Sequence, residues 1–324
     1  MNRNRIRQYA TEQTLQSMAL VVLNASLLGL MGWIVGGPRV AAVSIIGFSA
    51  AFFLTPKLNP ERWMRLYRGQ RLTDFQAPVL LSMTRDLAAR AGLPAIPAIY
   101  LIPSQEMGAF AMGTADNAVI GLTHGLVKTL KDTELQGVIA HEITHIRNRD
   151  IRLMNASRLV GQFTGILSMI GIVGLILSLP LILLGVAPVS LTGLLILISA
   201  PQLSLLIERA LSRVREFQAD LGAAELTGNP SGLARALQKI EQASDRQWLD
   251  WLVPGSLPQR QEGLQTHPPT RERIRRLLSM ASAETRRHRY ARDAVSISGR
   301  TFTHPYPPEQ MRIIIRRSPD FTYI

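Results

Sequence analysis

Long runs without charged residues alternate with polar segments along this chain. Residues 15–35, 40–54 and 159–207 contain no Asp, Glu, Lys or Arg. About 20 apolar residues in a helix cross a bilayer core, so the third run is long enough for two crossings joined by a turn near Gly185–Pro188. The run 40–54 follows Gly36–Gly37–Pro38 and is short for a full crossing, so it tilts little, extends into flanking residues, or is a tight re-entrant segment. The pattern predicts four transmembrane helices in two hairpins.

The hydrophobic pattern of the polar segments predicts the helices and short strands of a small α+β domain. Apolar residues at helical spacing predict a helix over 76–91. Ala98–Ile102 is typical of a short buried strand, and the apolar runs 109–112 and 118–120, separated by a Gly/Thr/Asp/Asn turn, predict a β-hairpin. Thr133 is a candidate N-cap for the helix that follows the hairpin. An edge strand of such a sheet can bind an extended peptide by main-chain hydrogen bonds, with Phe110 either in a side-chain pocket or in the core.

Composition supports the membrane assignment. The 324 residues are 47% hydrophobic, and the mean hydropathy is +0.12, above a typical soluble enzyme. Residues 15–35 are too long for an ordinary signal-peptide core and lack a clear cleavage site, so we interpret them as an uncleaved anchor.

Positive charges predict the orientation of the spans. They cluster before the first span and after the second, whereas the loop between these spans carries only Arg39 and the turn near Gly185 carries none; the clusters are Arg3, Arg5, Arg7 and Lys57, Arg62, Arg65, Arg68, Arg71. Lys and Arg favour the cytoplasmic side, so we expect the N-terminus and both polar segments to be cytoplasmic.

The polar segments hold a ligand set for a catalytic zinc. Residues 141–145 read His-Glu-Ile-Thr-His. Positions four apart share a helix face, so His141 and His145 can bind one metal while Glu142 lies beside the open coordination position as general base. The motif alone is a moderate signal.

Glu216 strengthens the prediction. Two histidines leave a zinc site one protein ligand short, and a carboxylate from a second helix completes a His2Glu site. Asp220, one turn later, faces the same way and could accept the free ring N–H of a ligating histidine. The alternative is a solvated helix face paired with Arg213 and Arg215. Beside the His141 motif we favour the metal site, with one Zn2+ per chain.

The order of motifs resembles the HtpX-type membrane-bound zinc metalloproteases, relatives of the CAAX prenyl endopeptidases. It comprises an anchor hairpin, a β-hairpin, HEITH, a second membrane hairpin, SRVREFQAD and THPPTRERI, over roughly residues 10–280. The resemblance implies zinc ligation by His141, His145 and Glu216, and catalysis by Glu142. It places His267 and Arg273 near the substrate or tetrahedral intermediate, and Ala109, Phe110 and Ala111 along the substrate. Gly108 departs from the family, which commonly has Asn there.

We therefore expect a mainly α membrane protein with four transmembrane helices and a zincin-like α+β metalloprotease domain with a small β-sheet. The expected domains are a membrane hairpin (1–56), a protease domain in two halves (57–158 and 208–283) around a second membrane hairpin (159–207), and a basic extension (284–324). The expected activity is hydrolysis of membrane or misfolded proteins at the cytoplasmic face of a bacterial plasma membrane, which by resemblance serves membrane-protein quality control. The alternatives are a CAAX-type prenyl-peptide endoprotease and a catalytically silent zinc-binding scaffold.

The net charge of +13 and the arginine-rich extension bear on partners. Arginine near a bilayer favours anionic headgroups, no motif supports nucleic-acid binding, and a solvated tail is as compatible with the extension as a lipid contact. We expect protein substrates and the lipid bilayer as partners. The chain has no cysteine, which excludes disulfides and thiolate metal sites.

Overall fold

Helices dominate the computed structural model, which describes residues 3–54, 60–185, 191–250 and 271–282. The chain divides into two compact units. One consists of Asn59–Arg149 and the chain from Phe217 onward, and the other of Asn2–Leu58 and Asp150–Glu216. We call them the α/β unit and the membrane unit.

A four-stranded mixed sheet forms part of the α/β unit, in the order β1-β2-β4-β3. The strands are β1 (Gln70–Arg71), β2 (Ala98–Ile102), β3 (Ala109–Thr114) and β4 (Asn117–Thr123). β2 and β4 are parallel, whereas β1 pairs with β2 and β3 with β4 antiparallel. The small sheet is as predicted, and its mixed topology and the two-residue strand β1 were not foreseen.

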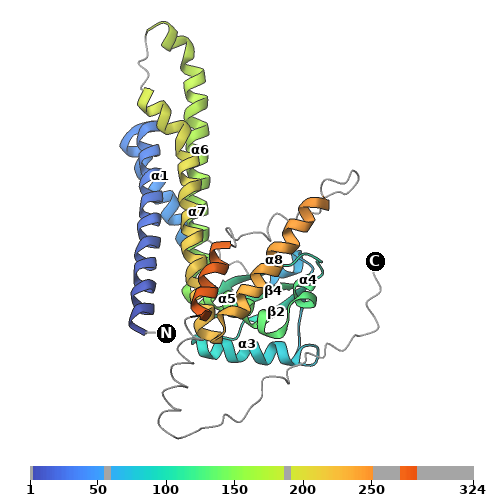
Figure 1. Cartoon of the computed structure of the whole chain (residues 1–324). Helices are drawn as coiled ribbons and strands as arrows, with labels where there is room; N and C mark the ends of the chain where they lie inside the picture. The colour runs from blue at the N-terminus through green and yellow to red at the C-terminus, as the bar shows by residue number, and fades with distance from the viewer. Residues whose placement is uncertain (1–2, 55–59, 186–190, 251–270, 283–324) are drawn as a thin grey trace, which may run out of the picture. The chain divides into compact units, whose positions relative to one another are not determined.

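Seven helical segments accompany the sheet in the described part of this unit. They are α2 (Pro60–Leu66), α3 (Pro78–Ala91), α4 (His124–Thr129), α5 (Asp132–Asn148), the end of α7 (Leu191–Thr227) from Phe217 onward, α8 (Pro230–Asp250) and the helical residues 271–282. Helix α5 packs against α3 and α8 and contacts β3 and β4 (Figure 1). It is therefore the central helix of this unit.

The two faces of the sheet bury different residues because side chains alternate along a strand. Ile99, Ile120 and Leu122 join the main core with residues of α3 and α5. Tyr100 and Val119 point to the other face and pack with Met64 of α2 in a smaller cluster. The face that carries the main core is the one that supports α5.

Helix α5 does not begin at the predicted cap. Lys131, not Thr133, is the N-cap, and Glu134 accepts a 2.8 Å hydrogen bond from the Lys131 backbone N–H. Burial opposes ionisation of Glu134, but the hydrogen bonds from Lys239 and Lys131 outweigh it and hold the pKa of this carboxyl below its usual value. The acidic residue three positions after the cap determines the start of the helix.

The membrane unit contains α1 (Arg3–Leu54), α6 (Asp150–Leu183) and the greater part of α7 (Leu191–Thr227). The backbone of α1 is not helical at Gly36 and Gly37, just before Pro38. A Cβ at Gly32 would lie 2.7 Å from Cα of Ala41, so the stretch after the break packs closely against the stretch before it. Helix α1 is thus two helical stretches folded back on each other, the hairpin geometry expected from the sequence.

Three helices of the described chain are long and apolar enough to cross a membrane: Leu15–Ala50 within α1, Leu153–Leu183 within α6 and Leu195–Thr227 within α7. Many apolar side chains on them are exposed, among them Met169 (67%) and Leu177 (75%). Such exposure on long apolar helices fits lipid contact. The fourth crossing, by the stretch after Pro38, stays a prediction.

Neutral polar groups join the three helices of the membrane unit. Asn24 of α1 donates from Nδ2 to Ser157 Oγ of α6 at 3.2 Å, and Ser204 of α7 donates to Asn24 Oδ1 at 2.8 Å. All three side chains are buried. Hydrogen bonds between neutral side chains are a common means of association for helices in lipid.

Candidate metal centre

Helix α5 presents two histidines one turn apart. Buried apolar residues, Val138, Ile139 and Ile143 among them, hold the helix in the main core. His141 and His145 are 4% and 6% exposed, and their Nε2 atoms lie 3.1 Å apart. Two nitrogens bound to one tetrahedral zinc, at about 2.0–2.1 Å each, would be about 3.3 Å apart. The two rings are thus placed to share one ion.

Glu216 of α7 lies with these histidines. Ligand atoms of His141, His145 and Glu216 all lie within 4.8 Å of one another, and all three residues are buried. Two imidazole nitrogens and one carboxylate oxygen are a donor set that zinc takes in catalytic sites, where the fourth position is left for water or substrate. The residues present therefore fit the metal that the sequence suggested.

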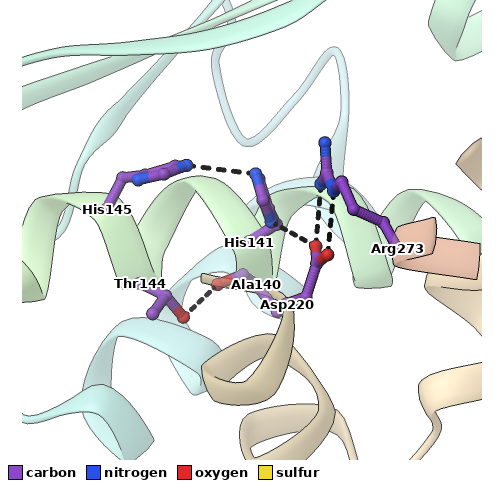
Figure 2. A network of polar contacts seen from close by, with 6 residues as sticks. All are labelled: Ala140, His141, Thr144, His145, Asp220 and Arg273. Atoms are coloured by element: carbon purple, nitrogen blue, oxygen red, sulfur yellow. Dashed lines mark hydrogen bonds and ion pairs between the residues drawn. The ribbon is translucent and has the colours of Figure 1, made fainter. Parts of the chain in front are cut away.

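Asp220 and Arg273 lie behind His141 (Figure 2). Asp220 Oδ1 is 3.1 Å from His141 Nδ1, and Arg273 donates to both carboxylate oxygens of Asp220 at 2.8 and 2.7 Å. A carboxylate at Nδ1 favours the tautomer with the proton on Nδ1, which leaves a lone pair on Nε2. Asp220 thus lies where its spacing from Glu216 placed it.

Arg273, which the family resemblance places near the substrate or the tetrahedral intermediate, pairs with Asp220 in the structure. Its side chain is 3% exposed, and the contact of Arg273 with a substrate stays a prediction. A buried carboxylate needs a charged partner, and the planar guanidinium forms two parallel hydrogen bonds to it. His267, assigned with Arg273, lies outside the described residues.

Glu142 follows the first histidine and is 3% exposed. It lies in the helical turn between His141 and His145 (residues 141–145 of α5). A carboxylate here can accept a proton from a water molecule bound near the two histidines.

A close approach of α7 to α5 brings Asp220 near His141. A Cβ at Gly222 would lie 2.8 Å from Thr144 Oγ1, and closer still to Thr144 Cγ2. Thr144 is fully buried and its hydroxyl donates to the Ala140 carbonyl, so it cannot easily move aside. Only glycine at position 222 permits this close approach of α7 to α5. Neither residue had this role in the prediction from the sequence, although Gly222 follows Asp220 by only two positions.

The substrate-contact candidates lie on strand β3, an edge of the described sheet. Ala109 and Ala111 pack against the main core, on the face that carries α5. Phe110 points to the other face, where its ring lies 5.5 Å from that of Tyr67. Phe110 is therefore a packing residue of the smaller cluster. The backbone groups along the free edge of β3 stay candidates for peptide binding.

Comparison with known proteins places these residues in a family. The model of peptidase family M48 matches residues 75–281. A "Protease HtpX homolog" from Thermococcus kodakarensis is 35% identical over 286 residues, covering 81% of this chain and 93% of its own length. One from Persephonella marina is 33% identical over 301 residues, covering 83% and 97%. The crystal structure of S. mikatae Ste24p matches with a TM-score of 0.43 and 20% identity, covering 83% of this chain and 66% of that one.

Proposed function

Because the chain belongs to peptidase family M48 and is an integral membrane protein, we propose that it is a zinc metalloendopeptidase. Its proposed substrates are membrane or misfolded proteins, which it cleaves at the cytoplasmic membrane face. The observation that carries the proposal is the convergence of His141, His145 and Glu216 within 4.8 Å. The family supplies the reaction class, and this donor set supplies a place for its metal.

In this proposal, each residue of the site has one task. His141, His145 and Glu216 hold the metal, and Asp220 orients His141 through Nδ1. A zinc ion held there would polarise the scissile carbonyl and would lower the pKa of a bound water molecule to about 7. Glu142 accepts a proton from the attacking water and then donates it to the leaving amine, so the carboxylate is regenerated at the end of each turnover.

The membrane anchors limit the substrates. The charges that flank the spans favour a cytoplasmic location for the protease domain, and anchoring restricts it to proteins or loops near the bilayer. The proposed domain organisation is a protease domain in two halves (57–158 and 208–283), preceded by one membrane hairpin (1–56) and interrupted by another (159–207). Four spans are few for the intramembrane chamber that a prenyl-peptide endoprotease would need, which favours protein substrates.

The decisive experiment combines metal analysis with a cleavage assay. The full chain, purified in detergent, is incubated with casein and with a membrane protein, with and without a zinc chelator. Glu142→Gln should retain zinc and lose at least about 100-fold in cleavage rate, because an amide cannot accept the proton. Glu225→Gln, at an exposed position of α7, serves as the matched control. Cleavage by Glu142→Gln within a few-fold of the wild-type rate would exclude Glu142 as the base, and zinc binding without any cleavage by the wild type would favour the scaffold.

A further inference from the structure

A buried ion pair joins the two ends of the segment Asp150–Glu216 of the membrane unit. Asp150 is the first residue of α6, and Arg215 is the residue of α7 just before Glu216. Arg215 Nη2 pairs with Asp150 Oδ1, and the two residues are 5% and 1% exposed. Both residues belong to the membrane unit. A solvated helix face that includes Arg215 was the alternative to the metal site, so the burial of Arg215 needs a physical explanation.

A second ion pair joins the same two helices and offers a comparison. Arg158 Nε of α6 lies 3.7 Å from Glu208 Oε1 of α7, with side chains 56% and 27% exposed. Solvated pairs of this kind contribute little, because water competes for both charges. Loss of one partner from a buried pair leaves the other charge without compensation. Loss of the Asp150–Arg215 pair should therefore have structural consequences, whereas loss of the Arg158–Glu208 pair should have few.

Chain connectivity links the buried pair to the proposed ligands. Helix α5 ends at Asn148, and Arg149, with φ 58°, caps it by donating its backbone N–H to the His145 and Ile146 carbonyls. Asp150 therefore follows the capped end of the histidine helix directly. At the other end, neighbouring residues of a helix point about 100° apart, so a fixed Arg215 side chain determines the direction in which Glu216 points.

We propose that Asp150 and Arg215 form a clasp that fixes Glu216 for metal binding. Both are positioning residues, which act through Glu216. The inference rests on the proposed function, since it takes Glu216 as the third ligand. The proposal gives a role to Asp150 and Arg215, which belong neither to the motif at residues 141–145 nor to the contact between His141 and Asp220.

Zinc affinity of the purified full chain, measured by competition with a chromophoric chelator, tests the clasp. Arg215→Gln and Asp150→Asn should each bind zinc about 10- to 100-fold more weakly, the usual effect of losing a group that orients a ligand. The double variant should be no weaker than the weaker single variant, because both changes break one interaction. Arg158→Gln and Glu208→Gln, the matched controls, should stay within about twofold of wild type.

Arg215→Lys separates a local effect from misfolding. It keeps the positive charge, so it should bind zinc more tightly than Arg215→Gln, and its circular dichroism spectrum should match that of wild type. Equal zinc affinity of the Lys and Gln variants would overturn the ionic basis of the clasp.

A metal-free measurement is possible because the chain has no cysteine. Spin labels at Asn155→Cys of α6 and Arg213→Cys of α7, both exposed, report the distance between the two helices near the clasp. Double electron–electron resonance should give one narrow distribution that Arg215→Gln broadens and Glu208→Gln leaves unchanged. An unchanged distribution in Arg215→Gln would overturn the clasp.

The outcomes separate the two proposals. If wild type and Arg215→Gln bind zinc equally tightly, the clasp is wrong and the proposed function stands. If the wild-type chain binds no zinc, the proposed function fails, and with it the role of the clasp toward a ligand.

Discussion

The α/β unit and the membrane unit both bury polar side chains, but of different kinds. In the α/β unit, Asp220 is buried between Arg273 and His141. In the membrane unit, the linking cluster consists of one amide and two hydroxyls, Asn24, Ser157 and Ser204. A buried charge is costly unless it is paired, and more so in lipid, whereas neutral polar groups need only a hydrogen-bond partner. The Asn24 cluster thus joins helices through neutral polar groups, whereas charged groups arrange the candidate ligands: Asp220 and Arg273 in the α/β unit, and the Asp150–Arg215 pair at the two ends of the segment Asp150–Glu216 of the membrane unit.

The apolar side chains of the two units also differ, in how far they are buried within the protein. In α5, Ile139 and Ile143 are fully buried and pack in the main core. In α6, Ile176 and Leu177 are 62% and 75% exposed. The first helix buries its apolar side chains within the protein, and the second offers them to lipid. Substitutions in the Asp220 cluster should therefore act on metal binding, and substitutions in the Asn24 cluster on helix association.

Glu216→Ala should give the largest effect. Glu216 lies on the same helix as Glu208, but only Glu216 has a carboxylate near both histidines. Removing it should abolish zinc retention through gel filtration, measured by atomic absorption, because two imidazoles alone hold zinc weakly. Glu208→Ala, which loses only a partly exposed ion pair, should retain one zinc per chain. Stoichiometric zinc in Glu216→Ala would make another residue the third ligand.

The parts of this site differ in how far the sequence predicts them. His141 and His145 are four residues apart on one helix, so local geometry alone brings them together. Glu216 and Asp220 follow from the donors that zinc requires, together with the spacing of one helical turn. Arg273 belongs to a segment with four arginines between residues 271 and 276, and composition does not tell which of them is buried. That choice depends on a tertiary contact with Asp220.

Arg273→Gln sharpens the contrast between charged and neutral clusters. Without the guanidinium, Asp220 loses both charge-assisted hydrogen bonds, so its hold on His141 weakens and zinc affinity should fall by roughly 10- to 100-fold. Chelator competition measures this. Arg275→Gln is the matched control on the same segment, because Arg275 is 80% exposed in its pair with Glu272. Unchanged zinc affinity in Arg273→Gln would mean that Asp220 orients His141 without the arginine.

The fold shows a similar division. Strands β2, β3 and β4 and the hairpin in α1 were predictable, because short apolar runs bounded by turn residues and the Gly36–Gly37–Pro38 break are local signals. The contacts between helices were not. Helices α6 and α7 are apolar over long stretches, so hydrophobic periodicity gives no indication of which face meets a neighbour. The same uniformity concealed the Asn24 cluster, and the Asp150–Arg215 pair, outside the charge-free run, depends on a tertiary contact between α6 and α7.

Gly222→Ala tests the close approach in the α/β unit. The added methyl would press on Thr144, which is fully buried, and overpacking of this kind costs about 1–3 kcal/mol. The thermal unfolding midpoint should fall, and Thr144→Ser in the same chain should restore part of it by removing the clashing Cγ2. Gly165→Ala in α6 is the control, since a Cβ there meets nothing within 4 Å. A wild-type midpoint in Gly222→Ala would show that the two helices can separate without cost.

Asn24→Leu should have the smallest effect and tests the membrane side of the comparison. The substitution removes one acceptor and one donor from the cluster and leaves Ser157 and Ser204 without the amide. Hydrogen bonds between helices in lipid contribute only about 0.6–2 kcal/mol, because the separated helices also find partners. The free energy of unfolding in mixed micelles should therefore fall by about 1 kcal/mol, while zinc affinity stays within about twofold of wild type. Asn155→Leu, at an exposed position of α6, should change neither quantity. A loss of zinc in Asn24→Leu would break the comparison, because a neutral cluster in the membrane unit would then govern the metal site.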